Sequence, residues 1–206
     1  MTETDSSLKK RFDHAVQLHM AGRLSEAEAL YRDVLALDNR HSESLHMLGV
    51  MAHQKGEHAK AADLLSTAIT INDTVAAYHF HLGLAAHSLG NLELARTSFE
   101  RAIDLQPDFA PAHHGLGNIF KSQNQLGQAV ASFRSAHALK TSTAYIYSLA
   151  EALLYQRKNV SEALALLEQV AETIPDHHAV HIGRGNALYE LGRPVEAIAA
   201  YERAIE

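Results

Sequence analysis

The 206-residue chain has no cysteine, which excludes disulfides and zinc sites built on thiolates. It also has no excess of basic charge, because 18 Lys and Arg stand against 24 Asp and Glu, for a formal net charge of −6. Proteins that bind nucleic acids usually carry a basic stripe, and the sequence shows none. We therefore expect no nucleic-acid partner.

Long apolar runs are missing as well. No stretch approaches the roughly 18 apolar residues of a membrane-spanning helix. The acidic segment 1–7 is unlike a signal peptide, which starts basic and then becomes apolar. These features predict no membrane partner and a cytoplasmic location.

Proline is scarce, and its four positions do not interrupt the apolar pattern of the chain. Pro111 and Pro194 stand where helices are expected to begin, a place that needs no backbone N–H. Segments such as 25–37, 59–71 and 92–105 carry apolar residues at three- and four-residue steps, and alternating β-branched stretches are absent. This periodicity predicts an all-α protein.

A 34-residue period runs through the whole chain. Alanine recurs at this spacing without a slip, at Ala27, Ala61, Ala95, Ala129, Ala163 and Ala197. Four residues after each alanine stands a bulky side chain: Tyr31, Leu65, Phe99, Phe133, Leu167 and Tyr201. Further upstream, glycine recurs at Gly49, Gly83, Gly117 and Gly185, with Ala150 in the fifth place. A second glycine series, in predicted turns, comprises Gly22, Gly56, Gly90 and Gly192.

This pattern resembles the tetratricopeptide repeat family, whose period is 34 residues. The resemblance implies a right-handed α-solenoid of six antiparallel helical hairpins, each made of a first helix A and a second helix B. We expect a flexible tail over 1–7 and one repeat domain over 8–206, with repeats at about 8–41, 42–75, 76–109, 110–142, 143–177 and 178–206. Small residues would let helices A and B approach closely, and the bulky series would fill the space between one hairpin and the next.

Three departures from the family pattern are visible. His79, His113 and His181 replace a large aromatic residue near the start of helix A, Ala150 replaces glycine, and the turn over 156–160 has one extra residue.

The resemblance also implies that the A helices line a concave groove that binds a peptide. By their phase in the repeat, the groove residues are His19, His46, Val50, His53, Phe80, Leu84, His87, His114, Asn118, Lys121, Tyr147, Asn186 and Tyr189. This groove is apolar with imidazoles in the first three units and carries amides and tyrosines further on. Such a surface suits a partner segment with apolar anchors and exposed backbone.

His19, His53 and His87 lie at a strict 34-residue spacing. They are interpreted either as a row of hydrogen-bonding and stacking groups in the groove or as exposed histidines inherited through repeat duplication. Whether they act as a pH switch is open. Because neighbouring repeats lie roughly 10 Å apart, they cannot share one metal ion. Only His177 and His181 have a chelating i,i+4 spacing, so we expect no metal.

Signs of catalysis are weak. Gly115-x-Gly117 and Gly183-x-Gly185 lack the third glycine and the preceding strand of a dinucleotide site, so we expect no cofactor and no enzyme activity. Two mechanisms known in the family are also absent. The carboxylate clamp of chaperone cofactors would need Lys, Asn and Arg where His46, Val50, Met47 and Phe80 stand. The Asn ladder of sugar transferases would occupy the sixth position of helix A, which reads Asp13, Met47, His81, Gly115, Ser148 and Gly183.

Two main functions stay open. The first is an adaptor that binds protein segments in the groove. The second is the N-terminal recruiting module of an enzyme of glycosyltransferase, sulfotransferase or methyltransferase type, continuing beyond Glu206, because the repeats look like bacterial arrays that often precede such domains. A peptide-holding chaperone is a third, lesser alternative. The sequence stops inside the last predicted helix and leaves Ala197, Tyr201 and Ile205 without a capping helix, which suggests self-association through this helix.

Overall fold

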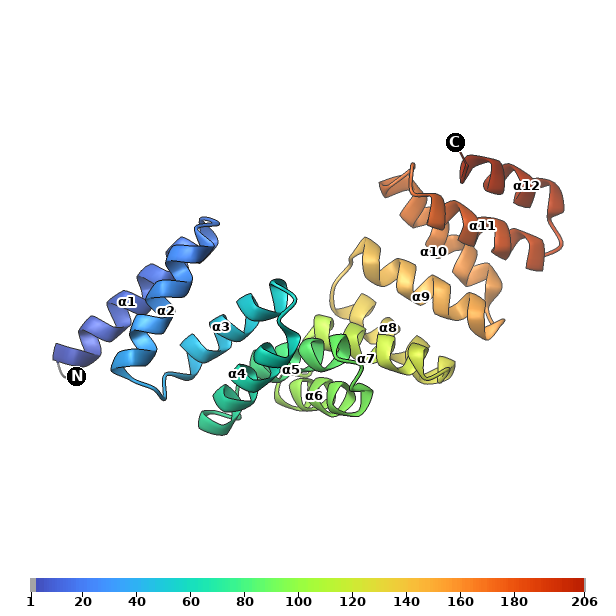
Figure 1. The fold of residues 1–206 in the computed structure, drawn as a ribbon. Coiled ribbons are helices and arrows are strands. Elements are labelled where there is room, and N and C mark those ends of the chain that lie inside the picture. The colour runs from blue at the N-terminus through green and yellow to red at the C-terminus, as the bar shows by residue number, and fades with distance from the viewer. Residues whose placement is uncertain (1–2, 206) are drawn as a thin grey trace. The chain divides into compact units, whose positions relative to one another are not determined.

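A computed structural model describes residues 3–205, which form twelve α-helices and, within that range, no strand (Figure 1). The chain divides into two compact units, the first ending at Pro107 and the second beginning at Asp108. The first unit contains α1 (Glu3–Met20), α2 (Leu24–Leu37), α3 (Ser42–Gln54), α4 (His58–Ile71), α5 (Ala76–Ser88) and α6 (Leu92–Leu105). The second contains α7 (Ala110–Ser122), α8 (Leu126–Leu139), α9 (Thr143–Gln156), α10 (Val160–Thr173), α11 (His178–Glu190) and α12 (Pro194–Arg203).

Each unit is a stack of three helical hairpins. Helices α1 and α2 pack together, as do α3 with α4 and α5 with α6, and the second unit repeats this pairing from α7 to α12. Within a unit, helix B of one hairpin packs on helix A of the next, and α3 contacts α5 just as α9 contacts α11. The predicted all-α fold with six helical hairpins is confirmed.

The ends of the chain differ from the sequence expectations. Helix α1 begins at Glu3, so residues 3–7 of the expected flexible tail are helical, while residues 1, 2 and 206 lie outside the described residues. In α12, Ala197 is buried, whereas Val195 and Ile198 are 79% and 58% exposed, and Ile205, just beyond the helix, is 87% exposed. The expectation of an uncovered face is therefore wrong for Ala197, which packs against α11, but Ile205 is exposed as expected. Self-association through this helix stays a prediction.

The turns within the hairpins follow the predicted glycine series. Gly22 has a φ of 75°, and its N–H donates to the carbonyl of His19 while the next N–H donates to the carbonyl of Leu18. This is the Schellman arrangement that ends many helices. The fourth and fifth hairpins lack the glycine, and their turns place Asn124, Arg157 and Asn159 at φ values between 52° and 58°. Asparagine enters this left-handed region readily, but arginine does not.

The hairpin core is built from a bulky side chain lying on a glycine. An ideal Cβ added to Gly83 would lie 2.6 Å from Cε1 of Phe99, and one added to Gly117 would lie 2.5 Å from Cε1 of Phe133. The ring therefore packs on the glycine of its own hairpin, 16 residues earlier, rather than only between hairpins as expected. Leu65 does both, because it covers Gly49 and also clusters with Leu82 of α5.

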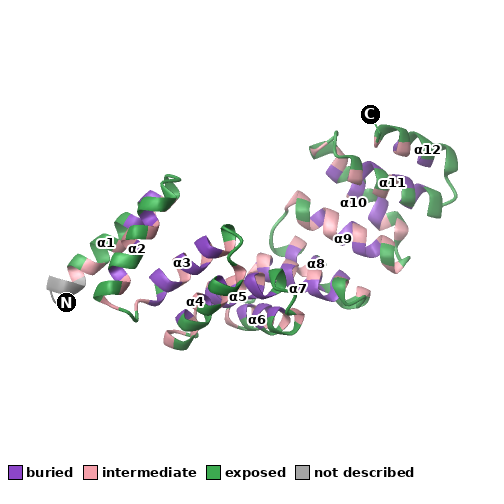
Figure 2. Ribbon diagram, viewed as in Figure 1, coloured by how far each residue is buried: buried purple, intermediate pink, exposed green. Residues whose placement is uncertain are grey.

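The fifth hairpin uses a matched exchange. Ala150 stands where four other hairpins have glycine and the first has Ala15, and the facing residue is Leu167, with which Ala150 shares a buried cluster. An aliphatic side chain on helix B thus faces the methyl group on helix A. Buried residues occur in every hairpin of both units, interspersed with exposed residues along the helices, as Figure 2 shows.

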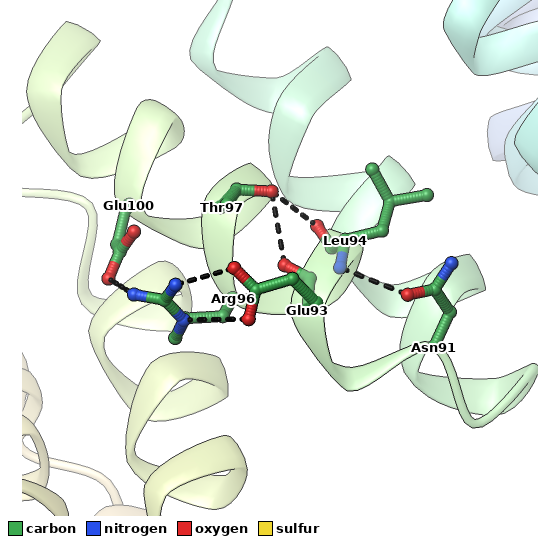
Figure 3. Close-up of polar contacts among 6 residues, drawn as sticks. All are labelled: Asn91, Glu93, Leu94, Arg96, Thr97 and Glu100. Atoms are coloured by element: carbon green, nitrogen blue, oxygen red, sulfur yellow. Dashed lines mark hydrogen bonds and ion pairs between the residues drawn. The ribbon is translucent and has the colours of Figure 1, made fainter.

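Local hydrogen bonds mark the start of α6 (Figure 3). The side chain of Asn91 accepts a hydrogen bond from the N–H of Leu94 at 3.1 Å, which satisfies one free donor of the first turn. Arg96 donates to Glu93 at 2.6 Å and to Glu100 at 3.0 Å. These exposed ion pairs contribute little to stability, because both partners are well solvated.

No helix in the part of the chain that the structure describes is long and apolar enough to cross a membrane.

Two glycine substitutions in the second unit should change stability in opposite directions. Gly117→Ala places a methyl group against Phe133 and should lower the free energy of unfolding by about 1–3 kcal/mol. Gly127→Ala, in α8, places a methyl group 3.7 Å from Gln156, an ordinary contact, and should raise it by roughly 0.5 kcal/mol. Urea unfolding of both variants measures this, and a Gly117→Ala protein as stable as wild type would contradict the packing described.

Candidate functional site

The first unit carries a pair of imidazoles between helices α3 and α5. Nε2 of His46 lies 2.9 Å from Nδ1 of His81, which also lies 2.8 Å from the carbonyl oxygen of Ala77. Because a carbonyl can only accept, the contact with Ala77 requires the proton of His81 on Nδ1, and Nε2 of His46 can then only share this one N–H as a second acceptor. The ring of Tyr78 lies 4.7 Å from that of His46, centroid to centroid.

Burial keeps these imidazoles uncharged at neutral pH. It lowers the pKa of His46 to about 4, with a further contribution from the nearby His81. Burial also lowers the pKa of His81, partly opposed by its hydrogen bond to Ala77, and the pKa of His53, where His58 adds to the effect. The face shared by α3 and α5 is therefore polar without carrying positive charge.

The three histidines of the predicted row have different neighbours. The ring of His19 lies 6.4 Å from that of Tyr31, His53 Nδ1 lies 3.1 Å from His58 Nδ1, and His87 is exposed. The other predicted groove residues of this unit, Val50, Phe80 and Leu84, are half-buried. A binding role for the row His19, His53 and His87 stays a prediction. The two histidines that the structure brings together in this unit's groove are His46 and His81.

In the second unit, polar bridges join α7 to α9. His114 Nε2 lies 2.9 Å from the hydroxyl of Ser148, and the ammonium of Lys121 donates to Glu151 at 2.6 Å. Asn118 is half-buried on α7. His114 thus bonds the sixth-position residue of the next A helix, as His46 does in the first unit.

A hollow of about 550 Å³ lies between α9 and α11. Three tyrosines line it, two of them strongly exposed: Tyr155 at 63% and Tyr189 at 69%, with the half-buried Tyr147 completing the set. The other lining residues are apolar or small at Leu154, Leu167, Ala179, Ile182 and Gly183, and polar or charged at Glu151, Arg157, Asn186 and Glu190.

Gly183 explains why the hollow exists. It occupies the repeat position that holds His81 and Ser148 elsewhere, the two side chains that bridge successive A helices. Without a side chain there, the space beside Tyr147 stays open, and the floor is formed by Leu167, whose methyl carbons would lie 3.2 Å from a Cβ on Gly183.

The rim of the hollow is charged on both sides. Nη2 of Arg157 lies 3.1 Å from Oε1 of Glu190. The pKa of the Tyr147 phenol is raised by burial first, and then by the negative charge of Glu151 and by Tyr155. Asn186 accepts a hydrogen bond from the hydroxyl of Tyr201 at 2.8 Å.

Tyr147, Asn186 and Tyr189, predicted from repeat phase, thus line one hollow together. Among the residues that were not predicted are the bridging residues His81 and Ser148 and the lining residues Tyr155 and Gly183. His81, Ser148 and Gly183 share the sixth position of helix A, one residue beyond the position of the predicted His46, Phe80, His114 and Tyr147. A search of both positions would have found them.

The histidines considered for metal binding are engaged separately. Nε2 of His181 lies 2.5 Å from the carbonyl oxygen of Pro175, and the ring of His177 lies 6.1 Å from that of Tyr147. Nowhere in residues 3–205 do three His, Asp or Glu side chains come together in a way that could hold a metal ion.

The buried imidazole of His46 should make stability depend on pH. The unfolded residue has a pKa near 6.5, whereas the folded one is lowered to about 4, so the unfolded chain binds more protons between these values. The contribution of the uncharged His46 to the free energy of unfolding is fully present above about pH 6.5. It is lost as pH falls towards 4, by up to about 3 kcal/mol.

Phe12 and Phe80 occupy the same repeat position as His46. The substitution His46→Phe should therefore be tolerated and should flatten the dependence of stability on pH. Urea unfolding of wild type and His46→Phe at pH 7, 6, 5 and 4.5 measures it. Parallel curves for the two proteins would show that His46 does not carry the effect.

Comparison with known sequences identifies repeats along the chain. A family profile described as Tetratricopeptide repeat matches residues 20–75 and 147–206, and a second, described as TPR repeat, matches residues 84–121. No curated protein sequence matches the chain significantly.

Many solved structures resemble the chain. The Pseudomonas aeruginosa protein pilF has a TM-score of 0.84 at 15% identity, covering 97% of this chain and 90% of its own. YrrB, described as a TPR protein with an unusual peptide-binding site, has a TM-score of 0.68 at 19% identity, covering 87% and 96%. At these identities the likeness shows the fold alone.

An O-GlcNAc transferase from Thermobaculum terrenum is also similar, with a TM-score of 0.63 at 26% identity. The match covers 67% of this chain but only 27% of that one. The resemblance is therefore confined to a part of a much longer protein.

Proposed function

Because the chain belongs to the tetratricopeptide repeat family, we propose that it binds protein segments on its A helices, with the main binding site in the hollow between α9 and α11. Members of this family are in general protein-interaction scaffolds. The proposed function is recognition without catalysis.

The hollow is the observation that carries this proposal. Its volume of about 550 Å³ falls within the range of roughly 300–1,000 Å³ that ligand pockets occupy. Tyr155, Tyr189 and Ile182 remain largely exposed beside an apolar floor, although burying such side chains is favourable. Aromatic side chains around a partly desolvated pocket are the usual anchors of protein interfaces.

The first unit would contribute a different surface. Val50, Phe80 and Leu84 provide apolar area, and the imidazoles of His46 and His53 stay uncharged at neutral pH. Such a surface suits the backbone and apolar side chains of an extended segment. We propose it, together with His19, His87, His114, Asn118 and Lys121, as additional contact area on the A helices.

Removing the exposed tyrosines tests the proposal directly. The probe is a set of 12-residue peptides selected on the wild-type chain from a random phage-displayed library. The double substitution Tyr155→Ala and Tyr189→Ala should weaken their binding more than tenfold, because two anchor residues are lost. Fluorescence polarisation with the synthetic peptides measures the change.

Ile198→Ala is the matched control, since this residue is 58% exposed on α12 and does not line the hollow. Its binding should equal that of wild type. The proposal fails if the library yields no binding peptide, or if the control variant loses as much affinity as the tyrosine variant.

A second candidate is recruitment of substrates for an enzyme domain on the same polypeptide. The similarity to part of the O-GlcNAc transferase favours it. This function would need the same step, binding of a protein segment, and so the tyrosine variant tests both candidates alike.

A further inference from the structure

We propose that the hollow between α9 and α11 accepts an arginine side chain of the partner segment, and that Arg157 of this chain occupies the edge of that place in the absence of a partner. This inference rests on the proposed function and specifies its ligand.

The aromatic lining suits a cation. Tyr147, Tyr155 and Tyr189 come from two helices and line the same hollow. The face of an aromatic ring carries negative potential, and a guanidinium stacks on it more readily than an ammonium does. An apolar guest would use the area of these rings but not their electrostatic character.

The charged residues around the hollow also bear on which side chain it accepts. Two carboxylates, those of Glu151 and Glu190, line the hollow. Glu151 is held by the ammonium of Lys121 at 2.6 Å, whereas Glu190 pairs, within residues 3–205, only with the exposed Arg157. The carboxylate that a positively charged guest can take over is therefore Glu190, and an acidic guest is disfavoured beside it.

The floor accommodates the rest of an arginine side chain. Leu167 and Leu154 provide apolar surface, and Gly183 leaves the space above them open. The methylene stem of a long cationic residue packs well on such a surface while its charged head reaches the polar rim.

Arg157 shows that a guanidinium can pair with Glu190 at the edge of the hollow. Its Nη2 lies 3.1 Å from Oε1 of Glu190, yet its side chain is 77% exposed. Exposed ion pairs of this kind are weak. The pair is thus easily exchanged for a guanidinium that brings additional contacts with the tyrosines.

The experiment measures which side chain the hollow prefers. Five pools of fluorescein-labelled 11-residue peptides differ only in their central residue, which is Arg, Lys, Leu, Phe or Glu, with the same random mixture of flanking residues. Fluorescence polarisation gives their affinity for the full 206-residue chain. The Arg pool should bind tightest, about fivefold or more above the Leu pool, with Lys between them and Glu weakest.

Three variants locate the preference. Glu190→Gln should reduce the advantage of the Arg pool at least fivefold, whereas Glu196→Gln, a control on α12 that pairs with Arg193 outside the hollow, should leave it unchanged. Arg157→Gly should tighten the Arg pool severalfold and leave the Leu pool unchanged, because it frees Glu190 and suits the left-handed backbone.

The outcomes separate this inference from the proposed function. A Leu or Phe pool that equals or exceeds the Arg pool overturns the inference, as does an equal effect of Glu190→Gln and Glu196→Gln. If the tyrosine double variant still loses binding of all pools in that case, the proposed function stands without the arginine preference. If no pool binds the wild-type chain, both fail.

Discussion

The contact between a bulky side chain of helix B and a small residue of helix A, a bare glycine in four of the six hairpins, is the constraint on which the hairpins depend. Phe99 on Gly83 and Phe133 on Gly117 bring the two helices so close that a single methyl group would not fit. The hydrophobic area of the ring is buried within the hairpin. The ring also contacts residues of the candidate surface on helix A, as Phe99 contacts Phe80 and Phe133 contacts His114.

Within each unit, the sixth position of helix A decides what happens between neighbouring A helices. His81 and Ser148 bridge to the preceding helix through His46 and His114 and close the surface with hydrogen bonds. Gly183 makes no such bridge, and the hollow opens beside it. One repeat scaffold thus produces a closed polar surface in one place and an open aromatic pocket in another, where Tyr147 and Gly183 stand in place of the two bridging residues.

The repeat register was predictable because it rests on residues that must be small or bulky at a fixed spacing. The alanine series around Ala129 and the turn glycines such as Gly22 therefore located all six hairpins. The individual groove residues were predicted by phase, and Tyr147, Asn186 and Tyr189 do meet at one hollow.

Other features needed the packed structure. The pairing of His46 with His81 joins residues on two different hairpins, and the proton position of His81 follows from the carbonyl of Ala77. The left-handed backbone of Arg157 arises in the turn with one extra residue, which the sequence shows without revealing which residue adopts it.

If the hollow is the binding site, a partner segment contacts α9 and α11. The most direct measurement is amide chemical-shift mapping of the ¹⁵N-labelled chain during titration with a library-selected peptide. We expect the shifted amides to concentrate around Ala179, Gly183 and Asn186 of α11 and on the facing part of α9. Shifts confined to the B helices α8, α10 and α12, with α9 and α11 unchanged, would contradict the assignment of the hollow as the binding site.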